Sequence, residues 1–495
     1  MAKPISILNH VLGPIMRGPS SSHSAAALRI GRLCRDLVGG NVTAIDCDFD
    51  PNGSLVSTHF TQGSDMGLIG GLLGWDASDK RLSDYHAHAE NSGLRFDVHS
   101  IDYGAEHPNT YRLHVHNGEE TRLITAISVG GGMIEVIDID GLPVSLEGDQ
   151  HVLLAYSDEG KPIGIRTSTQ PFPSDAESSL KADTGASMVR HLRPVVPVCG
   201  DQGVQVPFCT ATEMLEHDAG RGNSLPELAL EYEAARSGMS KDEIRRYVAR
   251  ILAIMRESLH IGLSGTSYAD RILPSQVGGY QAARKQGVLI GGDCFNEVVA
   301  SVTAVLEAKS AMEVIVASPT AGSCGVVPGA LLGVGKSMNR RDDELIDGLL
   351  TAGLIGMFIA GNATLAAEEG GCMAECGSAS GMSAAALVVM ANGTTEQSLS
   401  AASQALQSSF GMTCDTVANR VEAPCLGKNT MAATNALAAA NMALAGFDSL
   451  IPIDEVIDAM NEVGKLMPRQ LLCTGLGGIA TCPTSRAIEN RLETG

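Results

Sequence analysis

The sequence has few aromatic residues and no cluster of basic ones. Aromatic residues make up 4% of the 495 positions, with one tryptophan, so a core must be built mainly from Ala, Leu, Ile, Val and Met. Lysine and arginine (35) are outnumbered by aspartate and glutamate (56), which gives a formal net charge of −21. Nucleic acids and anionic membranes are usually bound by basic patches. Neither is therefore expected as a partner, and a carboxylate ligand would have to be held by local donors.

A secretion signal is also absent, because no long apolar segment precedes Gly13 and Pro14. Residues 348–367 are uncharged and long enough to raise the question of a membrane span, but they contain Thr351, Asn362 and several glycines. A buried core helix is the better interpretation. The twelve cysteines are expected to remain reduced in a cytoplasmic protein, so structural disulfides are not predicted.

Hydrophobic periodicity divides the sequence into an α/β part and a helical part. Residues 24–38 have a helical pattern, and residues 42–49 alternate as a half-buried strand does. From about residue 208 the pattern is helical, and Ser240 and Glu243 have the spacing of a capping box. The predicted fold class is an α/β N-terminal domain followed by a large all-α C-terminal domain. The predicted boundaries are 1–138 for the α/β domain, 139–205 for a connector or small β-containing insert, and 206–495 for the all-α domain.

Further elements are predicted within these parts. Residues 151–156 and 162–165 flank an Asp-Glu-Gly turn and predict a hairpin. Residues 167–179 are rich in proline and serine and predict a linker or exposed loop. Additional helices are predicted at 66–73, 396–410, 429–444 and 453–467, and additional strands at 95–101 and 111–116.

The first candidate site motif is Gly-Pro-Ser-Ser-Ser-His-Ser at residues 18–24, directly before the first predicted helix. Hydroxyls and free backbone N–H groups at a helix N-terminus are suited to holding a carboxylate, assisted by the helix dipole. Simple N-capping by serine is the alternative. Local pattern alone does not choose between them.

The second motif is Ala-Ser-Pro-Thr-Ala-Gly-Ser-Cys-Gly at residues 317–325, which follows an apolar strand predicted at 313–317. A turn of small residues that exposes its backbone amides can form an anion-binding nest. A tight strand-to-helix connection has the same composition. The motif is therefore weak by itself.

The third motif is a set of cysteines at positions 372, 376, 414 and 425. The CxxC spacing typical of zinc ribbons does not occur. Cys372, Cys414 and Cys425 each lie in a segment with glycine or proline, which allows thiolates to converge on an inorganic core. Inert core thiols remain the alternative on spacing alone.

Several motifs together resemble the iron–sulfur-dependent L-serine dehydratase family, with its β part and α part fused in one chain. They are the heptad at 18–24, Ser-Val-Gly-Gly-Gly at 128–132, the segment 318–329, Gly-Gly-Cys-Met-Ala-Glu-Cys-Gly at 370–377, Gly-Met-Thr-Cys-Asp at 411–415 and Glu-Ala-Pro-Cys-Leu-Gly-Lys-Asn at 422–429. The resemblance covers nearly the whole chain except residues 139–205.

The resemblance implies specific roles for residues of this chain. Cys324 and Cys376 would be packing residues beside a metal centre rather than its ligands. Cys372, Cys414 and Cys425 would ligate a [4Fe-4S] cluster; Ser20, Ser21, Ser22, Gln62, Asn109, Thr320, Ala321 and Gly322 would line the substrate site; and His23, His59 and His107 are the candidates for the base.

The implied activity is that of an oxygen-sensitive hydro-lyase of the L-serine ammonia-lyase type. Such an enzyme converts L-serine to pyruvate and ammonia, in amino-acid degradation and gluconeogenesis. An iron without a protein ligand would polarise the substrate hydroxyl as a Lewis acid. The resemblance also implies a homodimer that acts on a small molecule.

Two departures from the family pattern keep other substrates open. Gln62 stands where serine-specific members have histidine, and Met373 stands where they have glutamine. The alternatives are a dehydratase of 2-(hydroxymethyl)glutarate type, a cysteine desulfidase with the same cluster chemistry, and a cluster-free sensor of a small ligand. The iron content of anaerobically purified protein separates the sensor from the enzymes.

Overall fold

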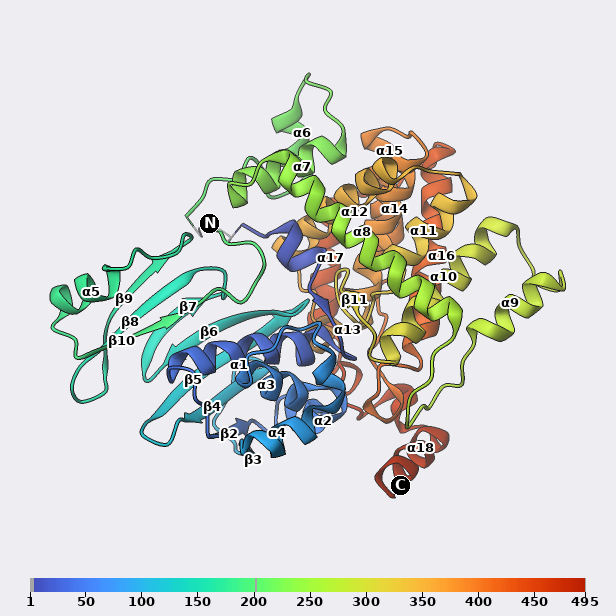
Figure 1. Cartoon of the computed structure of the whole chain (residues 1–495). Coiled ribbons are helices and arrows are strands. Elements are labelled where there is room, and N and C mark those ends of the chain that lie inside the picture. The colour runs from blue at the N-terminus through green and yellow to red at the C-terminus, as the bar shows by residue number, and fades with distance from the viewer. Residues whose placement is uncertain (1–3, 201–202, 495) are drawn as a thin grey trace. The chain divides into compact units, whose positions relative to one another are not determined.

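A computed structural model describes residues 4–200 and 203–494, which form two compact units (Figure 1). Unit 1 comprises Met1–Ser21 and Val204–Gly495, and unit 2 comprises Ser22–Gly203. The chain therefore leaves the helical unit after Ser21 and returns to it at Val204. Residues 4–21 thus group with the helical unit, whereas the predicted division assigned residues 1–138 to the α/β domain.

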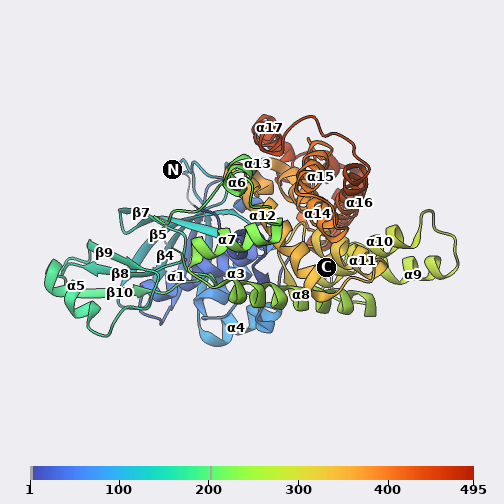
Figure 2. The same cartoon turned by 90° about the horizontal axis from the view of Figure 1, so that it is seen from above.

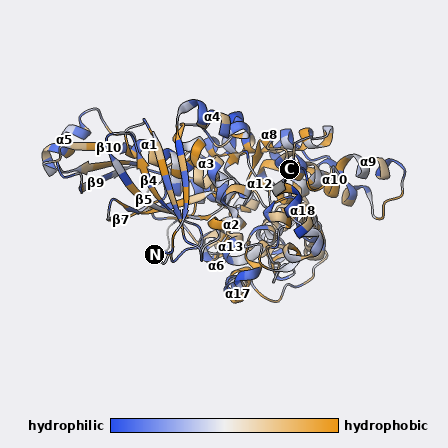
Figure 3. Ribbon diagram, turned by 90° about the horizontal axis from the view of Figure 1, so that it is seen from below, coloured by the Kyte–Doolittle hydropathy of each residue, from blue (hydrophilic) through white to orange (hydrophobic). Residues whose placement is uncertain are grey.

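Unit 2 is built on a six-stranded sheet with the strand order β3-β2-β4-β5-β6-β7. β2 and β3 are parallel, and the other neighbouring pairs are antiparallel. Apolar and polar residues alternate along β4, and buried and less buried residues alternate along β5 (Figure 3). The strands are β2 (Ala44–Phe49), β3 (Arg95–Ser100), β4 (Thr110–His116), β5 (Thr121–Gly130), β6 (Met133–Ile139) and β7 (Leu142–Leu146).

One face of this sheet is covered by helices that pack an aliphatic core against it. Ile45, Leu113 and Ile124 lie on this face and are fully buried. The face is apolar at alternate positions because successive strand side chains point to opposite sides. The helices of unit 2 that precede β4 are α1 (Ala26–Leu37), α2 (Leu55–Gln62), α3 (Ser64–Leu72) and α4 (Tyr85–Ser92), with the short helical turns η2 (Ser21–Ala25) and η3 (Lys80–Asp84).

The rest of unit 2 is a three-stranded sheet with the order β10-β8-β9. β8 (His151–Tyr156) and β9 (Pro162–Ser168) form the predicted hairpin, and β10 (Met188–Leu192) pairs with β8. The predicted loop at 167–179 is partly wrong, because α5 (Ala176–Thr184) begins inside it. This helix has nine residues, and Ala176 and Leu180 are the two that it buries, too few for a clear periodic signal.

Unit 1 is predominantly helical, as the sequence predicted for the C-terminal part (Figure 2). Its helices before the cysteine motif are α6 (Ala211–Asp218), α7 (Leu225–Ser237), α8 (Lys241–Ser264), α9 (Val277–Lys285), α10 (Asp293–Ser310), α11 (Val326–Ser337) and α12 (Asp342–Asn362). Those from the motif onward are α13 (Ala367–Cys372), α14 (Ser378–Met390), α15 (Thr395–Gln407), α16 (Cys425–Leu444), α17 (Ile453–Leu466) and α18 (Pro483–Thr494), with the short turns η4 (Met373–Gly377), η5 (Val417–Asn419), η6 (Arg469–Leu471) and η7 (Gly478–Thr481).

The N-terminal segment is an integral part of this helical unit. β1 (Ile15–Met16) pairs antiparallel with β11 (Ile315–Val316), and η1 (Ile7–Val11) packs on α12. The close packing depends on Gly356, because a Cβ there would lie 2.2 Å from Cγ1 of Val11. The buried carboxylate of Glu233 accepts hydrogen bonds of 2.7 Å from the Ser6 hydroxyl and the Ile7 amide. Burial raises the pKa of Glu233.

Two helical segments of unit 1 are long and apolar enough to cross a membrane, namely Asp342–Asn362 and Ala367–Met390. Their most apolar windows are 72% and 89% buried inside the protein, as expected for core helices of a soluble fold. α12 and α14 pack against each other in the centre of the unit. The observed architecture confirms the predicted fold class, a mixed sheet-and-helix region followed by a mostly helical one, with 53% helix overall.

Candidate functional site

The three predicted cluster cysteines come from separate segments of unit 1 and are all buried. Cys372 ends α13, Cys414 lies in the loop before η5, and Cys425 begins α16. The first two turns are held together by a 2.9 Å hydrogen bond from the Met373 amide to the Met412 carbonyl. Gly371 permits this approach, because its φ is +65° and a Cβ there would lie 2.7 Å from the Met412 oxygen.

A fourth cysteine, Cys473, joins this group from the C-terminal segment. Cys372, Cys414 and Cys473 form one buried cluster. The Cys414 amide donates to the Leu471 carbonyl at 2.8 Å, and the Cys473 amide donates to the Cys414 carbonyl at 3.0 Å. Hydrogen bonds to Cys372 and Cys473, followed by burial, raise the pKa of the Cys414 thiol. Sequence spacing gave no sign of this contact, because 59 residues separate Cys414 from Cys473.

Cys425 is tied to the Ser/Thr/Gly loop of residues 318–325 through the fully buried Asn429, one turn along α16. The Asn429 amide nitrogen donates to the carbonyls of Cys425 at 2.9 Å and Gly322 at 2.7 Å. Its oxygen accepts from the Gly325 amide at 3.1 Å. Asn429 thus positions the third thiol against the loop, a role that the sequence did not predict.

Positive charge lies close to these thiols. The Lys428 ammonium donates to the Thr413 carbonyl at 2.6 Å and to Asp415 at 2.5 Å. Burial alone would lower the pKa of Lys428, but Cys372 and Asp415 raise it above its ordinary value. Thiolates are the form in which cysteine binds metals, and a nearby ammonium favours the thiolate.

The donor set fits an iron–sulfur group. Buried thiols from separate turns with an ammonium beside them are what such a cluster requires. Within residues 4–200 and 203–494, no three His, Cys, Asp or Glu side chains are arranged around a single ion. In a four-iron cluster each cysteine binds a different iron, so its ligands need not meet at one point.

The predicted residues Thr320, Ala321 and Gly322 form a buried turn that leads from β11 into α11. The Thr320 hydroxyl donates to Oε1 of Glu375 at 2.6 Å, and the Ala321 amide donates to the Ser21 hydroxyl at 3.2 Å. A Cβ at Gly322 would lie 2.6 Å from Oε2 of Glu375, so this carboxylate packs directly against the turn. Burial raises the pKa of Glu375. The structure thereby brings Ser21 together with the 320–322 turn.

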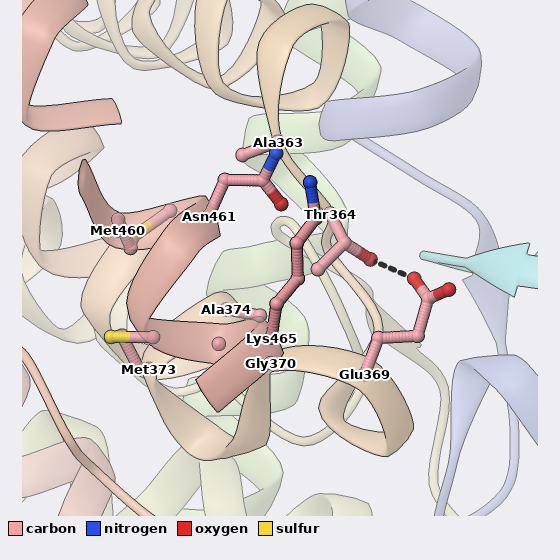
Figure 4. A pocket seen from close by; sticks show the side chains of 10 residues that line it. Ala363, Thr364, Glu369, Gly370, Met373, Ala374, Met460, Asn461 and Lys465 are labelled. Atoms are coloured by element: carbon pink, nitrogen blue, oxygen red, sulfur yellow. Dashed lines mark hydrogen bonds between the residues drawn. The ribbon is translucent and has the colours of Figure 1, made fainter. Parts of the chain in front are cut away.

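A small pocket of about 90 Å³ is lined by residues that flank Cys372 in the sequence, among them Gly370 and Met373 (Figure 4). Its walls come from the end of α12 and from α13, η4 and α17. Thr364 donates a 2.5 Å hydrogen bond to Glu369 at its rim, and Lys465 and Asn461 supply further polar atoms. Met373, which follows Cys372, is a wall residue, but none of the predicted site residues lines this pocket.

In unit 2, His23 belongs to a buried hydrogen-bonded chain that the sequence did not predict. Nε2 of His23 lies 2.8 Å from the Thr58 hydroxyl, and that hydroxyl donates to the Ser54 carbonyl at 2.7 Å. Because the single Thr58 proton is used by Ser54, Nε2 of His23 must be the donor, and Nδ1 carries the lone pair. Burial, followed by the charge of His59, lowers the pKa of His23 to about 3.

The same chain continues from Ser54 to Asn109. The Ser54 hydroxyl donates to Oδ1 of Asn109, and the Ser54 amide donates to the Pro108 carbonyl at 2.9 Å. His107 accepts a 3.1 Å hydrogen bond from the Asn109 amide through Nδ1. His23, His107 and Asn109 therefore lie in one connected network, with Ser54 and Thr58 as the members that sequence reasoning missed.

His59 and Gln62 lie on α2, three residues apart and hence on neighbouring positions of one helix face. Nδ1 of His59 is 2.8 Å from Oδ1 of Asp65, and the His59 side chain is 22% exposed. Gln62 is buried, and its carbonyl accepts a 3.1 Å hydrogen bond from Ser24. The pairing of Asp65 with His59 was not predicted from the sequence.

The predicted residues fall into two groups. Unit 1 contains Ser20, Ser21, Thr320, Ala321, Gly322 and the three cysteines, and unit 2 contains Ser22, His23, His59, Gln62, His107 and Asn109. Unit 1 is thus a helical unit with buried thiols beside a Ser/Thr/Gly turn, and unit 2 is an α/β unit that contains the candidate histidines. The chain passes from one unit to the other within the serine motif.

Comparison with known proteins gives matches to one family model and to several curated proteins. The family model described as "Serine dehydratase alpha chain" matches residues 220–480. A probable L-serine dehydratase alpha chain of Bacillus subtilis is 39% identical over 58% of this chain and 96% of that protein. L-serine dehydratase 1 of Escherichia coli is 27% identical over 94% of this chain and 96% of that protein. The chain belongs to the serine dehydratase alpha chain family.

Proposed function

We propose that this protein is an iron–sulfur-dependent L-serine dehydratase, which converts L-serine to pyruvate and ammonia. The observation that carries the proposal is the convergence of thiols from separate turns of unit 1, adjacent to the 320–322 turn. Relatives named L-serine dehydratase match along 94% of the chain, so the proposal concerns both units. The reaction is a dehydration followed by hydrolysis, and its products require no external oxidant.

Cys372, Cys414 and Cys425 would hold a [4Fe-4S] cluster. Such a group supplies a Lewis-acidic iron for the substrate hydroxyl when three of its irons have protein ligands and one has none. The chain contributes the thiolate environment. Lys428 stabilises negative charge beside Cys372, and Asn429 fixes the first turn of α16, where Cys425 lies.

The serine motif and the 320–322 turn would line the polar part of the substrate site. Ser21 already contacts the Ala321 amide, so its hydroxyl and the neighbouring backbone amides form a compact polar lining. Donors that are held in place before the substrate arrives bind charge without the cost of reorganisation. Such local donors compensate for the net charge of −21, which disfavours a carboxylate group.

His59 is the histidine whose geometry best suits removal of the α-proton. Asp65 holds Nδ1, which orients the ring and directs Nε2 away from the carboxylate, the arrangement in which a third group orients a base. The ring lies about one helical turn before Gln62, the position at which the family resemblance implies a histidine in serine-specific members. His23 has Nε2 committed to Thr58, and its lowered pKa makes it a weak base.

The reaction balances with water alone. Loss of the α-proton and the β-hydroxyl from L-serine releases one water and leaves 2-aminoacrylate. The enamine tautomerises to an imine, and one water hydrolyses it to pyruvate and ammonium. Buried donors around the carboxylate keep the substrate oriented until the hydroxyl has left.

Anaerobic purification followed by a substrate panel tests this function. The panel contains L-serine, L-threonine, L-cysteine and 2-(hydroxymethyl)glutarate, with keto-acid, sulfide and alkene products followed by absorbance and mass. We expect iron-containing protein that forms pyruvate from L-serine. Iron-free protein that binds but does not convert these compounds would indicate a sensor. Light scattering of the same sample tests the expected homodimer.

A dehydratase of a hydroxymethyl dicarboxylate is the second candidate, and Gln62 favours it. A neutral amide at this position can hydrogen-bond a second carboxylate without a change of charge state. Faster conversion of 2-(hydroxymethyl)glutarate than of L-serine would establish this candidate in place of the first.

A further inference from the structure

Two buried polar side chains in unit 2 have unused hydrogen-bonding groups. Within the described part of the chain, Nδ2 of Asn109 and Oγ of Ser128 have no hydrogen-bond partner. Both residues are fully buried. A buried donor without a partner costs about 1–3 kcal/mol, so such groups are few in folded proteins and call for an explanation.

These two groups are neighbours across the antiparallel β4–β5 pair. Thr110 pairs with Ile127, and the Ser128 amide donates to the Asn109 carbonyl at 3.1 Å, so Asn109 and Ser128 lie directly opposite each other. Opposite residues project from the same face of the sheet, with Cβ atoms about 4.5–5.5 Å apart. The two unpartnered groups therefore lie side by side.

They stand at the end of the buried face of the sheet. The preceding pairs on this face, Tyr111 with Ala126 and Leu113 with Ile124, are fully buried and mostly apolar. Asn109 and Ser128 are as fully buried as these apolar residues, so the polar pair is not the start of the solvent-exposed surface. The change from apolar to polar side chains thus creates a local pair of donors inside the protein.

The surrounding structure sets the direction of both donors. Ser54 donates to Oδ1 of Asn109, which leaves the NH2 group of the amide as the unused part. After Ser128 the register shifts and Gly130 has a φ of +93°, a bulge of the kind that re-aims side chains near active sites. The buried guanidinium of Arg29 donates to the Gly132 carbonyl at 2.5 Å and adds positive charge to the same turn.

We infer that Asn109 Nδ2 and Ser128 Oγ together bind one carboxylate of the substrate, with Ser128 as a further substrate-binding residue. A carboxylate accepts two hydrogen bonds from adjacent donors, and the nearby guanidinium favours the anion. The hydrogen bonds that link Ser54, Thr58 and His23 hold the Asn109 amide in this orientation. This inference rests on the proposed function, which gives the ligand as an α-amino or hydroxy acid.

The test uses anaerobic, iron-loaded full-length protein and its Ser128→Ala and Asn109→Asp variants. Ser128→Ala removes one donor, and Asn109→Asp replaces the amide donor by an anion while Ser54 can still donate to it. Loss of a hydrogen bond to a charged group corresponds to about a ten- to hundredfold change. We expect KM for L-serine to rise about tenfold or more in Ser128→Ala and about a hundredfold in Asn109→Asp.

A direct binding comparison identifies which part of the ligand the pair contacts. Wild-type protein is expected to bind L-serine more tightly than L-serinamide, and this preference should shrink about tenfold or more in both variants. Thr125→Ala, on the other face of β5, is the matched control and should leave the preference unchanged. Thermal unfolding and circular dichroism confirm that each variant is folded; if Asn109→Asp unfolds, Ser128→Ala decides.

Unchanged preference for the carboxylate in Ser128→Ala would overturn the inference. Tighter binding of L-serine by Asn109→Asp would also overturn it, because an added negative charge helps only if the amide faces the ammonium group. If the substrate panel identifies another hydroxy acid, the comparison is repeated with that acid and its monoamide. Failure of L-serine as the substrate is thereby distinguished from failure of the donor pair.

Discussion

Nδ1 of His59 lies 2.8 Å from Oδ1 of Asp65, the second residue of α3, which follows α2 and Gly63. Gly63 ends α2 with a φ of +90°, and this left-handed residue turns the chain back so that the carboxylate reaches the ring. The ring also packs at 5.6 Å from that of Phe49. Backbone turn and core packing together hold the histidine in one orientation.

If His59 is the base, His59→Gln should lower kcat for the best substrate by about a hundred- to ten thousandfold with little change in KM. Asp65→Asn should have a smaller effect in the same direction, since it loosens the ring without removing it. The measurement is kcat with L-serine that carries deuterium or hydrogen at Cα; the isotope effect should grow in His59→Gln because proton removal becomes slower. Full activity of His59→Gln would transfer the role to His23 or His107.

Gln62→His introduces the residue that the family resemblance implies for serine-specific members at this position. We expect activity on L-serine, relative to 2-(hydroxymethyl)glutarate, to rise about ten- to a thousandfold, on the scale of general-base catalysis reduced by imperfect placement. Steady-state kcat/KM for both substrates measures this ratio. Wild-type activity that already favours L-serine strongly, and that falls in Gln62→His, would show that position 62 does not set the substrate.

Cys372→Ala, Cys414→Ala and Cys425→Ala should each lose most of the bound iron while the helical circular dichroism signal remains. Thiolate ligands are few, whereas the helical core is large, so the metal is lost before the fold. Iron analysis of protein purified anaerobically gives the answer. Retention of full iron content by any one variant would remove that cysteine from the ligand set.

Two other cysteines serve as comparisons for that experiment. Cys482 is exposed, and Cys482→Ala should be silent. Cys473 is buried against Cys414, so Cys473→Ala should keep the iron but lower the thermal midpoint through lost packing. Loss of iron from Cys473→Ala would add a fourth thiol to the ligand set.

The stability of the protein should decrease on acidification because of His23. Its pKa is about 3 in the folded chain and about 6.5 in an unfolded one, so the unfolded state binds more protons below pH 6.5. The stabilising contribution is present above about pH 6.5 and is lost as pH falls toward 3. Urea unfolding at pH 7 and pH 5 should show wild type losing about 2 kcal/mol more than His23→Asn. Equal losses would mean that His23 is accessible to protons in the folded state.

Local sequence signals predicted long helices of unit 1 such as α8, but not the short helix that contains His59 and Gln62. The helix that the capping-box spacing of Ser240 and Glu243 predicts is present as α8 (Lys241–Ser264), where the Glu243 amide donates to the Ser240 hydroxyl. A capping box and periodic apolar residues are local signals, so the sequence alone reveals them. α2 (Leu55–Gln62) was not predicted, although it contains His59 and Gln62. Its eight residues bury Leu55, Thr58 and Gln62, a face defined by polar contacts to other elements that apolar periodicity cannot reveal.

By itself the sequence determined the fold class, the family and the residue types of the site, because these depend on composition, periodicity and short motifs. Only the tertiary structure decided which of those residues meet. The contacts of Cys414 with Cys473, of His59 with Asp65 and of Asn109 with Ser54 depend on turns, strand register and bulges. Such contacts form when separate segments pack to satisfy buried polar groups, and no local pattern encodes them.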